Sequence, residues 1–292
     1  MGCAACVIDV VRVTRIAVLS MCLVRASSRA GDGCHHVFLD AGANIGMHTR
    51  FLFEPAQYSK ATYPRDVFDP WFGRDRDLAT TCSFGFEPNP KHQHRHEYIQ
   101  RLYATRGYRY QYFMVGLGAT AGTLSFYRNN AVAHGGAHNS WGFGTTCRDK
   151  RCDDNVTVPV IDFASWIMEE IVGRAPPERP PSGVRPRVVL KMDIETAEYG
   201  VVSRMIANDT FCRALHYATI EWHPRFAPFK FESQHGATAI ASEEDALTAQ
   251  HTLEAEIDRR SKETTCLTGF SHGDFDDESY SMAGPEARRR AP

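Results

Sequence analysis

The residues with the clearest chemical signature form a short run after a predicted buried strand. Asp40-Ala-Gly42-Ala-Asn44-Ile-Gly46 places a carboxylate and two glycines directly after an apolar segment. In an open α/β sheet such a turn exposes backbone N–H groups, and glycine lets a ligand approach the main chain closely. The pattern predicts a ligand-binding turn before a helix over 47–53. The alternative is an ordinary tight strand-to-helix turn.

The carboxylate at the start of this run indicates which class of ligand the turn could bind. The spacing differs from the Gly-x-Gly-x-x-Gly fingerprint, in which a helix N-terminus binds a pyrophosphate. Asp40 would repel a phosphate, but it suits a ligand that carries positive charge. S-adenosylmethionine has a sulfonium and an ammonium group and no phosphate, so the turn favours methyl transfer over hydride transfer. An NAD-type oxidoreductase is the first alternative, and a catalytically silent binding module is the second.

A second carboxylate follows the next predicted strand. Glu87 closes that strand, and Pro-Asn89-Pro comes directly after it. A carboxylate at this position can accept hydrogen bonds from both ribose hydroxyls of an adenosyl group. We therefore assign Glu87 and Asn89 to cofactor binding. The alternative for Glu87 is an acid that stabilises the N-terminus of the following helix.

Two further strand ends carry candidate acceptor-site residues. Asp193 and Glu195 follow the most apolar predicted strand, and they are assigned to the acceptor substrate or to a divalent metal, or to capping the next helix. The sequence does not favour the metal. Glu221 and His223 end the next strand and are candidate general bases, with a buried hydrogen-bonded pair as the alternative.

A glycine- and histidine-rich loop over 134–144 has the composition of a substrate lid that excludes water on closing. Within it, His138 is the preferred general base. The alternative is a solvent-exposed loop histidine.

Three segments together resemble a known family. Phe38–Gly46, Phe86–Pro90 and Leu190–Glu198 are similar, in the same order, to the signature segments of FkbM-type S-adenosylmethionine-dependent methyltransferases. The resemblance implies a class I methyltransferase fold, S-adenosylmethionine as methyl donor, and a hydroxyl oxygen of a small molecule or sugar as acceptor.

Carried over position by position, the resemblance implies that Asp40, Gly42, Asn44 and Gly46 form the cofactor loop and that Glu87 binds the ribose of the cofactor. One position departs from the family pattern. Thr196 stands where the family has glycine, which puts the local backbone geometry or the acceptor pocket in question.

Hydrophobic patterning predicts alternating strands and helices, which imply a mostly parallel central sheet with helices on both faces. The predicted strands are 37–40, 82–86, 108–117, 188–193, 217–221 and 265–270. The predicted helices are 47–53, 91–105, 162–172, 197–207 and 243–260. Residues 122–127 are predicted to pair with 156–161 as an added hairpin, and 54–80 to form an inserted surface segment.

The chain is predicted to hold one catalytic domain over 34–282, an N-terminal segment over 1–30 and a tail over 283–292. An apolar run over 16–24 follows Arg12 and Arg15, as in a signal or weak membrane anchor. A soluble helix is the alternative. A cytoplasmic location is weighed slightly above a secretory or membrane-anchored one.

The charge of the chain indicates which kinds of partner it can bind. With 33 basic and 35 acidic side chains the net charge is −2, so no footprint for nucleic acid exists, and a small-molecule or glycan acceptor is expected. The oligomeric state is not indicated.

Among nine cysteines, Cys147 and Cys152 bracket a polar loop that suits a disulfide or two free thiols. Asn155 and Asn208 begin Asn-x-Thr sequons, which favour the secretory route slightly.

Overall fold

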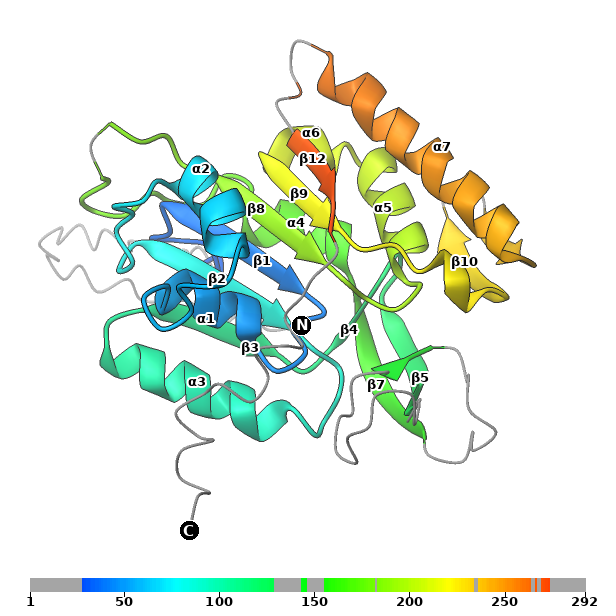
Figure 1. Cartoon of the computed structure of the whole chain (residues 1–292), viewed down its shortest axis with the longest axis horizontal. Coiled ribbons are helices and arrows are strands. Elements are labelled where there is room, and N and C mark those ends of the chain that lie inside the picture. The colour runs from blue at the N-terminus through cyan, green and yellow to red at the C-terminus, as the bar shows by residue number, and fades with distance from the viewer. Residues whose placement is uncertain are drawn as a thin grey trace, which may run out of the picture.

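The computed structural model describes residues 28–128, 143–145, 155–181, 183–233, 236–263, 266 and 269–273. Its central feature is a six-stranded sheet in the order β12-β9-β8-β1-β2-β3, in which every neighbouring pair is parallel (Figure 1). The strands are β1 (His36–Ala41), β2 (Thr81–Phe86), β3 (Arg109–Phe113), β8 (Val188–Met192), β9 (Tyr217–Ile220) and β12 (Gly269–His272). Strand order reverses between β1 and β8, as in doubly wound Rossmann-like sheets, which confirms the predicted fold class.

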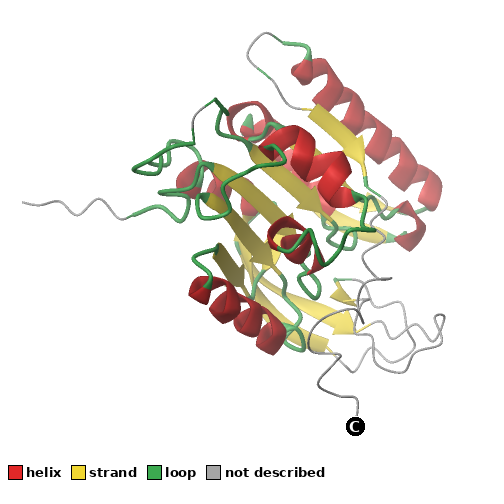
Figure 2. Ribbon diagram, turned by 60° about the vertical axis from the view of Figure 1, so that its left-hand side comes forward, coloured by secondary structure: helices red, strands yellow, loops and turns green. Residues whose placement is uncertain are grey.

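Helices cover both faces of this sheet (Figure 2). One face carries α1 (Met47–Phe53), the π-helical turn η1 (Pro64–Phe68), α2 (Asp69–Phe72) and α3 (Gln93–Thr105). The other carries α4 (Phe163–Glu170), α5 (Glu198–Ala207), α6 (Thr210–Ala214) and α7 (Glu243–Ser261). Strand alternation explains the two cores, because Val37 and Leu39 of β1 pack into one and Phe38 into the other.

A second sheet has the order β4-β7-β5-β6. It contains β4 (Gly116–Gly118), β5 (Gly122–Arg128), β6 (Phe143–Gly144) and β7 (Asn155–Asp162). The predicted added hairpin is confirmed, since β5 and β7 are antiparallel and Gly122 lies opposite Val160.

One of the predicted strands corresponds to two separate strands in the structure. The strand expected over 108–117 ends at Phe113 in the central sheet, and its last residues belong to β4 of the second sheet. The apolar run continues through this change of sheet, so hydrophobicity alone does not show it. Gly116 permits the close packing there, because a Cβ atom at this position would lie 2.8 Å from the Phe126 ring.

The segment over 54–80 was predicted to lie on the surface, and this was wrong for its large apolar side chains, although many of its polar residues are exposed. Tyr58, Phe68 and Phe72 are almost completely buried in the core that surrounds Phe38. Their spacing follows no helical or strand period, because the chain forms a π-helical turn that runs into the short helix α2. A hairpin of β10 (Phe229–Ser233) and β11 (Gly236–Ile240), together with a 3₁₀ turn η3 (Pro224–Phe226), was also not predicted.

Two disulfides connect described residues of the chain, and neither pairing was predicted. Cys34, just before β1, is bonded to Cys82 in β2. Cys212 in α6 is bonded to Cys266, which precedes β12. Cys147 and Cys152 lie outside the described residues, as do nearly all of the N-terminal segment 1–30 and the whole tail 283–292. In the described part of the chain, none of the helices has both the length and the apolar character needed to cross a bilayer.

Candidate functional site

The turn after β1 is wedged between the ends of its two neighbouring strands. Gly42 has a φ of 75°, and a Cβ atom there would lie 1.7 Å from the backbone oxygen of Asp193. Only glycine fits this position. On the other side, the N–H groups of Gly42 and Ala43 both donate to the carbonyl oxygen of Phe86, at 3.0 Å each. The turn therefore lies at the carboxyl edge of the sheet, where the strand order reverses.

Glu87 meets the same turn. Its Oε2 accepts a hydrogen bond from the backbone N–H of Asn44 at 2.9 Å, and its Oε1 accepts one from Asn89 N–H at 2.8 Å. The two predicted halves of the cofactor site thus lie side by side. Burial raises the pKa of the Glu87 carboxyl to about 8, against the effect of the two N–H donors. Much of the carboxyl is therefore protonated at neutral pH.

Other predicted cofactor residues shape the turn. Asn89 is fully buried, and its side-chain oxygen accepts from Lys91 N–H at 3.1 Å, so it fixes the bend after β2. Gly46 has a φ of 79° at the start of α1. Gly42 and Asn44 are the partly exposed members of the turn, whereas Ala43, Ile45 and Gly46 are buried.

Asp40 supports the turn from inside the protein. Its side chain has no exposed surface, and its Oδ2 accepts from the Thr49 hydroxyl at 3.3 Å. The Lys191 ammonium lies 4.0 Å from Asp40 Oδ1 and donates to the carbonyl oxygen of Gly42 at 2.7 Å. Burial raises the pKa of Asp40 to about 6, and the Lys191 charge limits the rise. Asp40 is thus a positioning residue in this structure.

Lys191 was missed in the sequence, although one signal for it exists. It is the single charged residue within β8, and its side chain is fully buried. A lysine inside an otherwise apolar strand is unfavourable unless it is paired. Its ammonium also lies 3.5 Å from Asp193 Oδ2, which joins the turn to the neighbouring acidic cluster.

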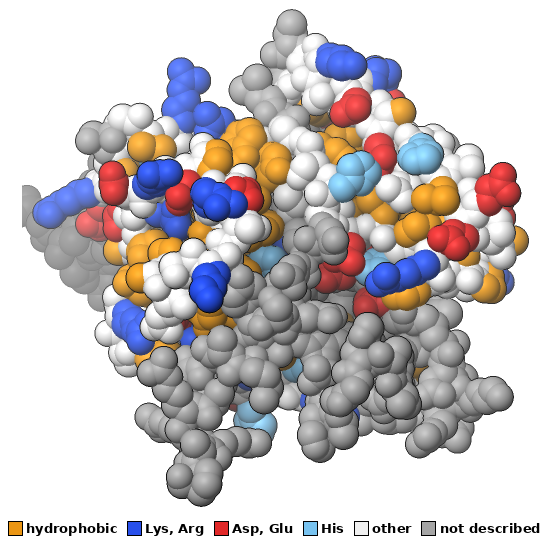
Figure 3. Space-filling model, in the orientation of Figure 1, with side chains coloured by type: hydrophobic (Ala, Val, Ile, Leu, Met, Phe, Trp, Pro, Cys, Tyr) orange, Lys and Arg blue, Asp and Glu red, His pale blue; other side chains and the backbone are white. Residues whose placement is uncertain are grey.

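That cluster surrounds His223. Glu198 Oε1 lies 3.1 Å from His223 Nδ1, while Asp193 Oδ1 and Glu221 Oε1 lie 3.6 and 3.8 Å from Nε2. Figure 3 shows acidic side chains beside histidine near the middle of the face, close to where β9 and β12 end in Figure 1. Glu198 was not assigned from the sequence, although it stands only three residues after Glu195.

The carboxylates change what His223 can do. Burial alone lowers the pKa of His223, but Glu198, Asp193 and Glu195 outweigh burial and raise it to about 9. The side chain is therefore an imidazolium at neutral pH, which donates hydrogen bonds and does not accept a proton. Among the candidate bases in the described residues, this leaves Glu221, whose side chain is 23% exposed.

The segment after β8 has an unusual backbone. Glu195 and Thr196 have φ values of 54° and 85°. Such angles favour glycine and are rare for β-branched residues, where they cost on the order of 1–3 kcal/mol. Thr196 therefore adopts a strained, left-handed backbone conformation, and it is almost fully buried.

We expect Thr196→Gly to be more stable than Thr196→Ala by about 1 kcal/mol, because only glycine relieves the positive φ, and this gain outweighs the packing of the one methyl group that alanine keeps. Urea unfolding of the two variants measures the difference. Equal stability, or a more stable alanine variant, would contradict the left-handed conformation of this residue.

Stability should fall as the pH rises from about 6.5 to about 9. The pKa values of Glu87 and His223 are raised in the folded protein from 4.5 and 6.5 to about 8 and 9, so the folded state holds more protons across this range. Thermal unfolding at the two pH values tests this. The slope should be smaller in Glu87→Gln, and a melting temperature that rises with pH would contradict the assignment.

The structure thus brings ten of the eleven predicted site residues to one edge of the sheet. Asp40, Gly42, Asn44, Gly46, Glu87 and Asn89 form the turn region, and Asp193, Glu195, Glu221 and His223 form the adjoining cluster. His138, and nearly all of the predicted lid over 134–144, lie outside the described residues. Within the described ranges, no group of three or more His, Cys, Asp or Glu side chains is arranged to hold a metal ion.

One solved structure is similar to this chain. No protein-family model matches the sequence, and no curated protein matches it. The crystal structure of methyltransferase FkbM from Methylobacillus flagellatus KT is similar, with 14% sequence identity and a TM-score of 0.29. The match covers 61% of this chain and 30% of that one. A likeness at this level assigns neither a family nor an activity.

Proposed function

We propose that this protein is an S-adenosylmethionine-dependent methyltransferase that acts on a hydroxyl oxygen of a small molecule or sugar. One observation carries the proposal. A glycine turn and the Glu87 carboxyl meet where the strand order of a parallel sheet reverses, through a 2.9 Å hydrogen bond from Asn44. Ligands of open α/β sheets bind at this place.

The polar groups of the turn fit an adenosyl amino acid. The side-chain oxygen of Asn44 is buried and has no hydrogen-bond partner among the described residues, so it can accept from a ligand ammonium or hydroxyl. Glu87 retains lone pairs for ribose hydroxyls beyond its two backbone contacts. No pyrophosphate-binding glycine spacing is present in the turn.

The acidic cluster provides groups that can align the acceptor hydroxyl and remove its proton. When bound, S-adenosylmethionine supplies an electrophilic methyl group on a sulfonium, so the protein has mainly to align the acceptor oxygen and remove one proton. We assign proton removal to the Glu221 carboxylate, because His223 beside it is already protonated. The His223 imidazolium orients Glu221 and Asp193 from within the protein.

Calorimetry with S-adenosylhomocysteine, S-adenosylmethionine and NAD tests the proposal. We expect both adenosyl ligands to bind and NAD not to bind. The all-parallel strand order is also that of dinucleotide-binding sheets, so preference for NAD would establish an oxidoreductase instead. Binding of none of the three would indicate a silent module.

A matched pair of variants locates the ligand. Glu87→Ala should weaken S-adenosylhomocysteine binding at least about tenfold, which corresponds to about 1.4 kcal/mol. Glu97→Ala, at a partly exposed position of α3, is the control and should bind as the unaltered protein does. Circular dichroism checks that both variants fold. Equal affinities in the two variants would remove Glu87 from the site.

A further inference from the structure

We propose that Asn155 is an acceptor site for an N-linked oligosaccharide, and that Asn208, which begins the second Asn-x-Thr sequon, is not. The proposal is independent of the methyl-transfer function. It depends on two observations: the redox state of the cysteines, and the different surroundings of the two sequons.

The disulfides indicate the compartment. Cys34 and Cys82 are each 1% exposed and are bonded to each other inside the main core, and Cys266 of the second disulfide is 2% exposed. Disulfides that are largely buried and that join segments far apart in the sequence are structural, and such bonds form in oxidising compartments. Formation of each bond releases two protons and two electrons, which pass by thiol–disulfide exchange to the disulfide form of an oxidoreductase and reduce it to a dithiol. In eukaryotic cells, the same compartment transfers oligosaccharides to asparagine.

The first sequon is open to solvent. Asn155 is the first residue of β7, and Asn155 and Thr157 are both exposed. Side chains two apart on a strand share a face, so the amide and the hydroxyl of the sequon lie on the same side of the sheet. The opposite face holds Val158 and Val160, which are buried against Phe126. A glycan on Asn155 therefore extends into solvent without displacing the core.

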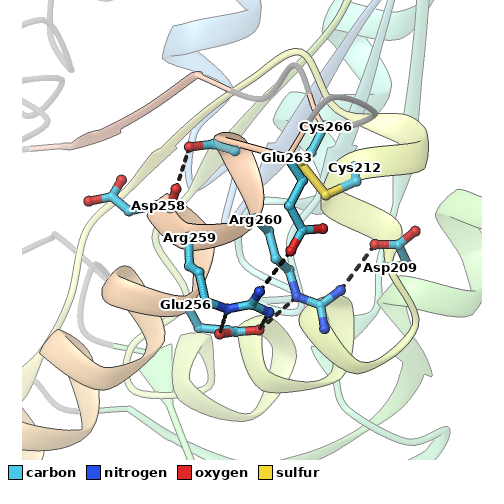
Figure 4. The surroundings of a disulfide bond; sticks show 9 residues. Asp209, Cys212, Glu256, Asp258, Arg259, Arg260, Glu263 and Cys266 are labelled. Atoms are coloured by element: carbon cyan, nitrogen blue, oxygen red, sulfur yellow. Dashed lines mark hydrogen bonds and ion pairs between the residues drawn. A yellow bond between two sulfur atoms is a disulfide. The ribbon is translucent and has the colours of Figure 1, made fainter.

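The second sequon is enclosed. Asn208 directly follows α5 and is half-buried, and Thr210 has no exposed surface. Between them, Asp209 accepts a hydrogen bond from Arg260 of α7 at 3.1 Å. Figure 4 shows this ion pair beside the Cys212–Cys266 disulfide. A glycan at Asn208 would have to emerge from the corner where α6 and α7 are held together.

The chemistry is a single displacement. The donor is an oligosaccharide linked through a diphosphate to a lipid. The bond between sugar C1 and the phosphate oxygen breaks, and a bond from C1 to Nδ2 of Asn155 forms. The amide loses one proton, and the lipid diphosphate leaves.

The test expresses the full chain behind a cleavable secretory leader in eukaryotic cells. Peptide N-glycosidase in heavy-oxygen water converts each glycosylated asparagine to labelled aspartate, which peptide mass spectrometry locates. We expect label at position 155 and none at position 208. In parallel, Asn155→Gln should abolish the enzyme-sensitive gel shift, while Asn208→Gln, the matched control, should keep it.

Unlabelled Asn155 or labelled Asn208 in the secreted protein would overturn the proposal. A non-reducing peptide map of the same sample tests its premise. We expect the linked pairs Cys34–Cys82 and Cys212–Cys266. Free thiols at these four positions in a folded, secreted chain would also overturn it, because the structural argument for the compartment would be lost.

Discussion

Lys191→Met is expected to lower the free energy of unfolding by about 3–5 kcal/mol, the usual cost of removing one partner from a buried ion pair. The ammonium of Lys191 is fully buried, and it lies 4.0 Å from the buried Asp40 carboxylate. Methionine leaves that carboxylate without its cation and Gly42 without a hydrogen-bond donor. Urea denaturation measures the loss, and calorimetry should show weaker S-adenosylhomocysteine binding as well.

Two further variants make this result specific. Combining Lys191→Met with Asp40→Asn removes the uncompensated charge, so the double variant should recover part of the lost stability. Lys230→Met, at an exposed position of β10, is the matched control and should change stability by less than about 0.5 kcal/mol. If Lys191→Met behaved like Lys230→Met, the buried pair would not stabilise the turn.

Cys34→Ala with Cys82→Ala is expected to cost about 4 kcal/mol of stability. The disulfide closes a loop with a sequence separation of 48, and the loss of chain entropy in the unfolded state gives this magnitude. Both cysteines also contact the main core, so alanine is chosen to keep the substitution apolar. Chemical denaturation under non-reducing conditions measures the difference.

Reduction provides the control for the disulfide prediction. Dithiothreitol should destabilise the unaltered protein and should have a smaller effect on the double variant, which retains only the Cys212–Cys266 disulfide among the described pairs. A double variant as stable as the unaltered protein would show that this cross-link does not contribute.

Much of the fold was predictable because its strands are apolar runs that end in recognisable turns. The helix over Met47–Phe53 was placed without error, since the glycine turn fixes its start. The hairpin of β5 and β7 also followed from local alternation. Residues 54–80 were not predictable, because aromatic packing against Phe38 depends on contacts and not on any period.

The site was predictable to the same degree. Strand ends converge at one edge of a parallel sheet, so the position of Glu87 near the glycine turn followed from topology. The charge state of His223 did not, because it depends on Glu198 from a different element. The side of the sheet to which the Lys191 side chain points could not be predicted either, since both faces of a central parallel strand are buried.

Asp193 limits how this protein can be altered by evolution or by design. The main-chain oxygen of Asp193 packs closely against Gly42, and its carboxylate lies between Lys191 and His223. Under the proposed function, a substitution there would disturb both donor and acceptor recognition, so the two could not be tuned separately through this residue.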